Sequence, residues 1–295
     1  MHGSKKTHKS WLKNYKVAKV FNNGRLYIQT LKYLKKQTNL NYPKVLFLFN
    51  NFINKKYPIC NVLLYEKKIV GFVGTIFSQK KYNKKKFLNC NIHSWMVDTN
   101  HRIGSSMLIN QIKQNCIITV LSSLPRLEKT FLKLGFKKFN MKYKIIFIKK
   151  FFAKNIKLSF DILHNQNFLM KKTNKSQQKI IKDYNNSRFK KFIFFNSISK
   201  KNCLIIGDVT KKKRFFKTLN IIYCSNTSFL KKNIFIFYTL IQKYFKVHFC
   251  GEFYINKSKS ILKKSNLSKI INKTIYLKRT PKNYQFDLLY SETEF

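Results

Sequence analysis

The chain has 295 residues, enough for one large domain or two of ordinary size. Hydrophobic residues make up 44% of it, which argues against a wholly disordered protein because a packed core can form. Lysine and arginine number 61 against 10 acidic residues, a formal charge of +51. A polyanion such as nucleic acid would explain this excess. An AT-rich genome would explain it as well, and we favour that explanation because the lysines are spread through every segment. In either case the charge would attract RNA non-specifically at low salt.

The sequence predicts a cytoplasmic protein without a membrane span or a bound metal. Residues 1–6 are polar and no apolar segment follows them, so no targeting signal is expected. The longest apolar runs, such as residues 234–238, are too short to cross a bilayer. None of the six cysteines lies in a CxxC pair. Buried, reduced thiols are therefore expected in place of a metal site or a disulfide framework.

The first predicted elements are a helix and a hairpin. The apolar face of the helix consists of Leu26, Ile28, Leu31, Tyr33 and Leu34. Residues 59–65 and 69–77 are predicted strands, joined by a tight turn. Gly71 and Gly74 lie in the second strand, and a close neighbour of its backbone would explain both. The lysine-rich residues 79–86 are expected to form a solvated loop, with the steering of an anionic substrate as the alternative.

The next stretch, residues 88–113, is predicted to begin as a strand and to end as a helix. Between the two elements lies the loop of residues 101–106, which is rich in small residues. Free backbone N–H groups and the helix dipole bind phosphate at such a helix start. Gly104 would let a ligand approach the backbone, and Arg102 adds a positive charge. An ordinary strand–turn–helix connection is the alternative interpretation.

The order of the elements that follow the loop of residues 101–106 is typical of a known fold. Residues 116–121 are predicted as a buried strand, residues 126–134 as a short helix that ends at Gly135, and residues 142–148 as a further strand. This order of elements resembles the acyl-CoA N-acyltransferase (GNAT) superfamily. The resemblance rests on residues 69–74, 95–98, 101–106 and 131–136.

The resemblance implies an α+β fold, with a mixed, mostly antiparallel central sheet flanked by helices, in residues 1–150. It implies acetyl-CoA or another acyl-CoA as the co-substrate and an amine, on a small molecule or a protein, as the acceptor. In the family, the strand matching residues 92–97 splays from the strand matching residues 116–121, and the pantetheine arm lies in the opening. The implied cofactor-binding residues are Met96, Val97, His101, Arg102, Ile103, Gly104, Ser105 and Ser106.

The resemblance also implies a role for each part of this set. Met96 and Val97 supply backbone groups to the pantetheine arm, and the amides of residues 102–106 hold the pyrophosphate. Two positions depart from the family pattern. His101 stands where the family has Arg or Gln, and Ser106 stands where it has Gly or Ala, which reduces the clearance for a ligand.

The sequence identifies the catalytic residues less clearly than the cofactor-binding residues. Phe131 occupies the position of the tyrosine that many family members use as a general acid, and it has no proton to give. An amine is mostly protonated at neutral pH, so a base or a water relay is needed. His93 is a candidate base, and it is expected to point away from Ser94. The alternative, which we favour, is an ordinary histidine on a half-exposed strand. Ser122 ends the second strand and could hold a water or the thiolate. Without acidic partners a triad is not expected, and direct transfer is favoured over a covalent intermediate.

Residues 151–295 are predicted to repeat part of this order. The predicted elements are strands at 191–195, 203–207 and 219–224, a helix at 229–245 and a strand at 246–250. Since residues 59–121 show the same order, we expect a second, degenerate GNAT-like lobe whose phosphate loop is missing. Residues 284–295 hold three of the ten acids and are expected to dock as a tail on a basic surface. The chain also resembles an uncharacterised bacterial subgroup of acyltransferase-like proteins with a trailing second half.

Three functions follow as hypotheses. The first is a CoA-dependent N-acyltransferase, specifically an acetyltransferase, whose acceptor could be an amino sugar, a small amine or a protein lysine. The second is a basic RNA-binding protein on a vestigial acyltransferase fold. The third is a catalytically inactive scaffold, which Phe131 suggests. The sequence does not predict the oligomeric state.

Overall fold

The computed structural model describes residues 12–38, 40–51, 56–82, 85–112, 115–121, 125–148, 159–184, 189–212, 216–254, 260–262 and 268–280. The strands of the first half are β1 Tyr15–Val20, β2 Cys60–Tyr65, β3 Lys68–Tyr82, β4 Lys85–Val97, β5 Cys116–Val120 and β6 Lys137–Phe147. Its helices are η1 Leu12–Asn14, α2 Arg25–Lys35, α3 Tyr42–Asn51, η2 Thr99–Gly104, α4 Ser105–Asn110, η3 Pro125–Leu127 and α5 Glu128–Lys133. The strands of the second half are β7 Phe160–Leu163, β8 Phe189–Asn196, β9 Asn202–Lys212, β10 Phe216–Cys224, β11 Phe249–Tyr254 and β12 Ser268–Lys278. Its helices are α6 Gln166–Lys172, α7 Lys175–Asp183, α8 Thr227–Lys232 and α9 Ile234–Phe245.

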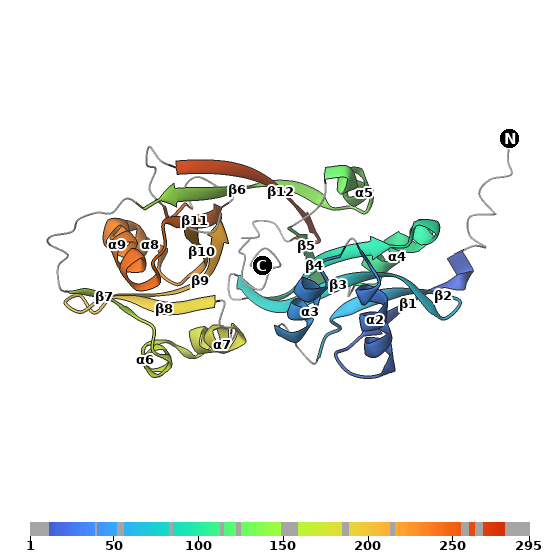
Figure 1. Cartoon of the computed structure of the whole chain (residues 1–295), viewed down its shortest axis with the longest axis horizontal. Helices are drawn as coiled ribbons and strands as arrows, with labels where there is room; N and C mark the ends of the chain where they lie inside the picture. Colours follow the sequence, from blue (N-terminus) through green and yellow to red (C-terminus); the bar gives the residue numbers. More distant parts are fainter. Residues whose placement is uncertain are drawn as a thin grey trace.

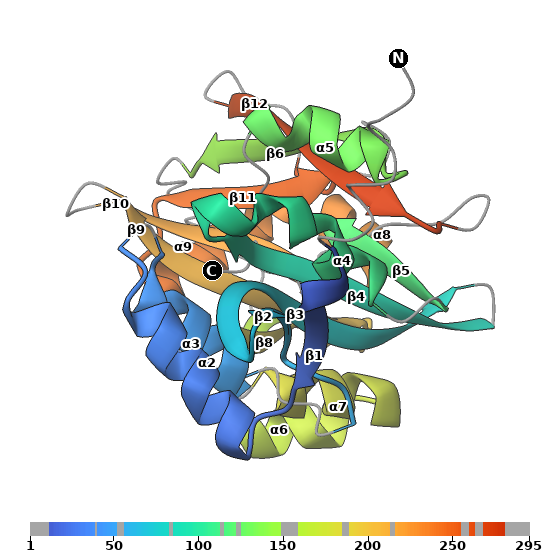
Figure 2. The ribbon, with the colours of Figure 1, turned by 90° about the vertical axis from the view of Figure 1, so that its right-hand side faces the viewer.

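Within the described residues, 12 strands form one sheet in the order β1-β2-β3-β4-β5-β12-β6-β11-β10-β9-β8-β7. Neighbouring strands are antiparallel except for the pairs β4/β5 and β10/β11, which are parallel. Helices flank the sheet (Figures 1 and 2). The predicted α+β class, with a mostly antiparallel sheet between helices, is therefore confirmed.

The helices of the first half cover both faces of strands β1 to β5. On one face, Leu34 of α2 and Phe49 of α3 pack with Phe72 of β3 in a buried cluster. On the other face, Leu108 of α4 and Phe131 of α5 belong to a second buried cluster. Figure 2 shows α2 and α3 away from α4 and α5. The two clusters thus lie on opposite faces of the sheet.

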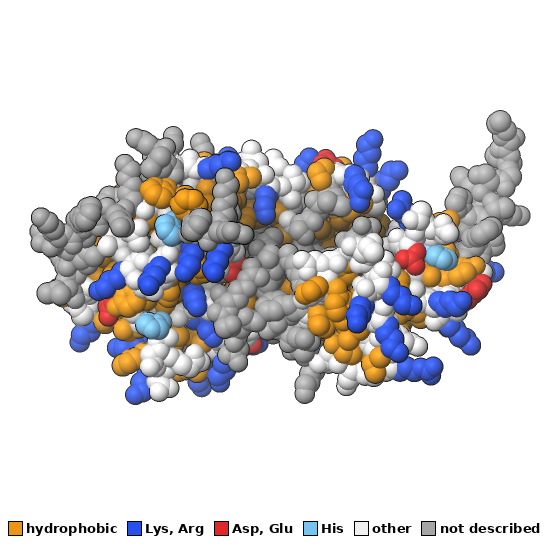
Figure 3. All heavy atoms as spheres, viewed as in Figure 1, with side chains coloured by type: hydrophobic (Ala, Val, Ile, Leu, Met, Phe, Trp, Pro, Cys, Tyr) orange, Lys and Arg blue, Asp and Glu red, His pale blue; other side chains and the backbone are white. Residues whose placement is uncertain are grey.

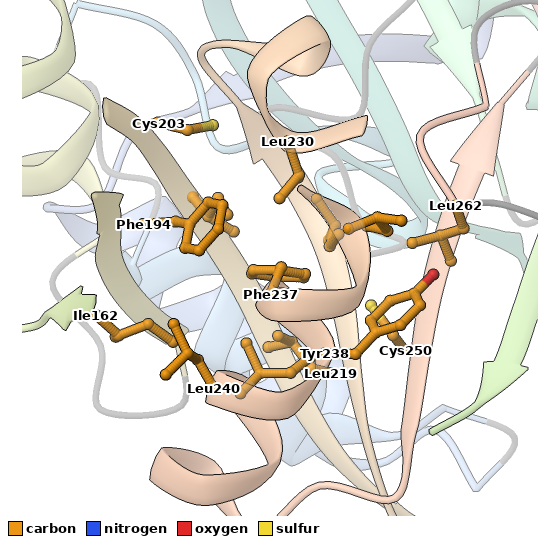
Figure 4. Close-up of a cluster of buried hydrophobic side chains, with 14 of the residues drawn as sticks. Ile162, Phe194, Cys203, Leu219, Leu230, Phe237, Tyr238, Leu240, Cys250 and Leu262 are labelled. Atoms are coloured by element: carbon orange, nitrogen blue, oxygen red, sulfur yellow. The ribbon is translucent and has the colours of Figure 1, made fainter. Parts of the chain in front are cut away.

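The second half repeats the connection of the first. Strands β8, β9 and β10 are antiparallel, helices α8 and α9 follow, and β11 then runs parallel to β10. Strands β2 to β5 show the same order and the same parallel last pair. Helix α9 packs its apolar side, including Phe237 and Leu240, onto Phe194 and Leu219 of the strands (Figure 4). The repeat expected from the order of elements is present in the strand directions too.

Three local predictions need correction. Residues 79–86 were expected to be a loop, but β3 extends to Tyr82 and β4 begins at Lys85, because backbone pairing continues to the hairpin end. The predicted helix 229–245 is two helices, since Asn233 has non-helical dihedral angles of −112° and 26°. Ile28 is 56% exposed, so the buried face of α2 is narrower than predicted.

No helix of the described residues is long and apolar enough to cross a membrane.

Strand β12 was not predicted, and it joins the two halves. It pairs with β6 from Ser268↔Ile146 to Leu277↔Lys137, and its last part also pairs with β5. The strand therefore separates β5 from β6, as Figure 1 shows in red and green. Residues 281–295, which include the predicted docking tail, lie outside the described residues. The first half of the chain needs this late strand to complete its sheet.

Substitutions in β12 test this dependence. Ile275 is fully buried and packs with Leu121 and Met141, so Ile275→Ala is expected to lower the free energy of unfolding by about 2–5 kcal/mol. Ile270 lies on the same strand but is 46% exposed, and Ile270→Ala is expected to change the stability by less than about 0.5 kcal/mol. Urea unfolding of both variants measures the difference. Equal effects would contradict the placement of β12 inside the sheet.

Candidate active site

Strands β4 and β5 are paired until β5 ends. Their parallel pairing extends from Leu88↔Cys116 to Ile92↔Val120, where β5 ends. Strand β4 continues to Val97, and along this last part it pairs with β3 alone among the described strands. One side of residues 93–97 therefore has no neighbouring strand in the described structure. The splay of the two strands that the GNAT resemblance implies stays a prediction, because β5 is paired with β4 over its full length and then ends.

A β-bulge lies in β4 just beyond the end of β5. Gly74 of β3 pairs with His93 and Phe72 pairs with Met96, so one residue of β3 opposes two of β4. Ser94 in this bulge has a φ of 50°, which is uncommon for a residue with a side chain. His93 Nδ1 and Ser94 Oγ lie 3.1 Å apart. The prediction that these two side chains point to opposite faces is wrong, because the bulge interrupts the alternation.

His93 is buried, with 4% of its surface exposed, and not half-exposed as predicted. A Cβ atom at Gly74 would overlap the His93 ring, so the ring lies directly over the backbone of β3. Phe49 of α3 meets the ring edge to face at 6.2 Å. A Cβ atom at Gly71 would lie 2.8 Å from Val97 Cγ2. The prediction that close neighbours explain both glycines is confirmed.

The face of the sheet that holds His93 also carries buried, uncharged polar side chains. Asn91 and Asn89 precede His93 at alternate positions of β4, and Ser78 pairs with Asn89. Thr119 of β5 donates a hydrogen bond to Asn91 at 3.0 Å. Ser78 Oγ, Asn89 Oδ1 and Asn91 Nδ2 have no hydrogen-bond partner in the described part of the chain. Such buried groups usually have a hydrogen-bond partner, so this face of β4 is polar although it is buried.

The opposite face of the bulge is aromatic. Phe131, the residue at the family's tyrosine position, is buried and lies 5.6 Å from Trp95, centroid to centroid. Tyr276 of β12 stacks on Phe131 at 5.0 Å and donates a hydrogen bond to Glu128. Hydrogen bonds from Lys138 and Tyr276 hold the pKa of Glu128 below its ordinary value. Sequence reasoning missed Tyr276, because it lies 145 positions after Phe131 and nothing predicted its strand.

The predicted phosphate loop is a short 3-10 helix, η2, that continues into α4. His101 turns toward β1, where its Nδ1 lies 3.0 Å from the Tyr15 hydroxyl. A Cβ atom at Gly104 would lie 2.9 Å from Leu63 Cδ2, so this glycine allows the helix to pack closely on the sheet. Arg102 is exposed and remains the positive charge of the loop.

The other predicted site residues are placed as follows. Ile103 is 43% exposed, Ser105 and Ser106 are half-buried, and Met96 and Val97 are half-buried next to the bulge. Ser122 lies outside the described residues. The structure therefore brings His93, Met96 and Val97 together at the bulge and places residues 101–106 at the end of β4. Their contacts with a cofactor stay predictions.

Asp98 fixes the start of this loop. Its backbone N–H donates to Val70 O at 2.8 Å, and its carboxylate accepts a hydrogen bond from the Tyr33 hydroxyl at 2.7 Å. Burial, together with this hydrogen bond, raises the pKa of Tyr33. The end of β4 is therefore held to both β3 and α2, which belong to the first half.

Comparison with solved structures shows the same architecture elsewhere. A GCN5-related N-acetyltransferase from Anabaena variabilis superposes with a TM-score of 0.60 and 12% identity, over 89% of this chain and 72% of that one. A GCN5-related N-acetyltransferase from Kribbella flavida has a TM-score of 0.56 at 7% identity, over 89% and 70%. A probable N-acyltransferase from Enterococcus faecalis has a TM-score of 0.55 at 12% identity, over 89% and 72%. No protein family and no curated protein matches the sequence.

These identities show a shared fold. The chain has the fold of the GNAT N-acetyltransferases, as the resemblance predicted, and the similarity extends over both halves of the chain.

A double-mutant cycle tests the geometry of the bulge. Gly74→Ala is expected to lower the free energy of unfolding by about 1–3 kcal/mol, because the new methyl group would overlap the His93 ring. In the His93→Ala background the same substitution is expected to have a smaller effect, since the ring is gone. Urea unfolding of the four proteins gives both values. An equal loss in the two backgrounds would contradict a ring that lies over Gly74.

Proposed function

We propose that the protein is an acyl-CoA-dependent N-acyltransferase, with acetyl-CoA as one co-substrate, that transfers an acyl group to an amine. The observation that carries this proposal is the end of β5 at Ile92↔Val120, beyond which β4 runs on to Val97, in a fold shared with N-acetyltransferases. On that side residues 94–97 have no neighbouring strand among the described residues, and their backbone N–H and C=O groups can pair with a ligand. An extended chain of amides, such as pantetheine, pairs with such groups as an added strand does.

In this proposal the cofactor lies along β4 and reaches the start of α4. The backbone of Met96 and Val97 pairs with the pantetheine arm. Residues 101–106 lie next to the pyrophosphate, and Arg102 supplies the charge because His101 is engaged by Tyr15. The polyanionic end of the cofactor also gains from the high positive charge of the whole chain.

The acceptor amine approaches on the face that holds His93. His93 removes a proton from the ammonium group, and Ser94 orients the imidazole through the 3.1 Å contact. The amine nitrogen then attacks the thioester carbonyl, the new C–N bond forms, and the C–S bond breaks. The nitrogen gives up its second proton as the amide forms, and because Phe131 cannot protonate the leaving thiolate, water carries this proton to the sulfur. The buried polar groups of Ser78, Asn89 and Asn91 lie on this same face and favour a neutral, hydrogen-bonding acceptor body over an acidic one.

Cofactor binding is tested with an exposed arginine. Arg102→Ala is expected to weaken the binding of CoA and acetyl-CoA about fivefold, roughly 1 kcal/mol, because one charge-assisted contact is lost. Arg25→Ala removes an equally exposed arginine at the start of α2, on the other face, and is expected to leave the affinity unchanged. Isothermal titration measures both. Absence of CoA binding by the unaltered protein at hundreds of micromolar CoA would remove the proposal.

Catalysis is tested with the buried histidine. His93→Ala is expected to lower kcat at least about a hundredfold while CoA affinity is kept, since a general base acts after binding. His164→Ala, at an exposed position of the second half, is the control and should keep full activity. Release of free CoA from acetyl-CoA is followed with amino sugars, polyamines and lysine peptides as acceptors. An unaltered protein that releases no CoA with any of these amines would favour the inactive scaffold.

The excess of 51 positive charges keeps RNA binding as a second candidate. In Figure 3 the lysine and arginine side chains are scattered over the visible face and do not form one stripe. Specific RNA binding would survive Arg102→Ala and would fall steeply with salt, whereas CoA binding depends on Arg102. Titration with a single-stranded RNA at two salt concentrations separates the two functions.

A further inference from the structure

A pair of cysteines lies in the second half, away from the proposed site. Cys203 is near the start of β9, and Cys224 is the last residue of β10. Cys224 pairs with Ile205, so Cys203 is its diagonal neighbour on the same face of the two strands. The two Sγ atoms lie 3.2 Å apart. All six cysteines carry free thiols, and Cys224 is the one that is not fully buried.

The two sulfurs share one contact. Either sulfur can be the donor of the hydrogen bond between them, and the Cys203 thiol also donates weakly to Leu204 O at 3.7 Å. The contact with Cys224 lowers the pKa of Cys203 against the effect of burial, and the same contact raises the pKa of Cys224. Figure 4 shows Cys203 at one end of the buried cluster beneath α8 and α9. The thiolate is the reactive form of cysteine, so the two sulfurs are unequal in reactivity.

We propose that Cys203 and Cys224 are a modification site, a thiol pair that hydrogen peroxide converts to a reversible disulfide. The Cys203 thiolate attacks one peroxide oxygen, the O–O bond breaks, and the hydroxide that leaves takes a proton to become water. The product is a sulfenic acid on Cys203. The sulfur of Cys224 then attacks that of Cys203, the S–S bond forms, the S–O bond breaks, and the thiol proton leaves with the oxygen as a second water. Peroxide gains the two electrons that the two sulfurs lose.

The geometry favours this reaction over oxidation at the other cysteines. The sulfurs need to approach by about 1 Å to reach a disulfide bond of roughly 2.05 Å. Cys203 itself is fully buried, and the partial exposure of the adjacent Cys224 gives peroxide access to the pair. Cys60 and Cys250 are buried as well, and burial raises the pKa of each. A disulfide here would tie the start of β9 to the segment that leads into α8. This inference does not rest on the proposed transferase activity.

Peptide mapping of the full chain tests the proposal. After treatment with hydrogen peroxide and alkylation of the remaining thiols, the expected result is one linked pair of peptides that contain Cys203 and Cys224, and its loss after dithiothreitol. Cys224→Ser should abolish the link and leave a sulfenic acid on Cys203 that dimedone traps. Cys60→Ala removes a buried thiol of the first half and should leave the link intact. A link that involves other cysteines, or equal oxidation of all six, would overturn the proposal.

A second measurement does not depend on peroxide. Phenylarsine oxide bridges two neighbouring thiols, so one equivalent is expected to bind the unaltered protein and the Cys60→Ala variant. Neither Cys203→Ser nor Cys224→Ser should bind it tightly. Retained tight binding in either of these two variants would show that the sulfurs do not act as a pair.

Discussion

Strand β5 stops at Val120 while β4 runs on to Val97, and the local geometry of the site follows from this difference in length. The bulge at Ser94 shapes the part of β4 that extends beyond β5. It turns the side chains of His93 and Ser94 toward each other and rotates the backbone that follows. Gly74 is the matching adaptation on β3, since any side chain there would collide with the imidazole. A left-handed serine is a strained arrangement, and strain of this kind persists where the surroundings fix it and function uses it.

Much of the fold was predictable from the sequence, since hydrophobic runs and turn residues marked β2, β5, α2 and the end of α5 at Gly135. The predictions that failed depend on long-range pairing. Strand β12 carries lysines and asparagine between its apolar residues, and only its partners β5 and β6 give it a place in the sheet. The lysine-rich residues 79–86 have a composition typical of a loop. Backbone pairing between β3 and β4, and not residue type, makes most of them strand.

The candidate site was predictable in its position but not in its details. The order of elements located the loop of residues 101–106 and the end of β4. It could not reveal that His101 would turn to Tyr15, because the hydroxyl comes from a strand 86 positions away. The alternation rule for strands also failed at Ser94, since a bulge is a feature of two strands together. The polar row of Ser78, Asn89 and Asn91 emerged only when the register was known.

The late position of β12 in the chain has a consequence for synthesis. A ribosome completes β5 and β6 long before it reaches Ser268. Until β12 has been made, the edge of each strand that pairs with β12 therefore has no partner. Contacts between residues so distant in sequence form slowly, and the nascent first half cannot close its sheet until β12 has been made. These edges are therefore exposed to pairing with other chains until β12 arrives.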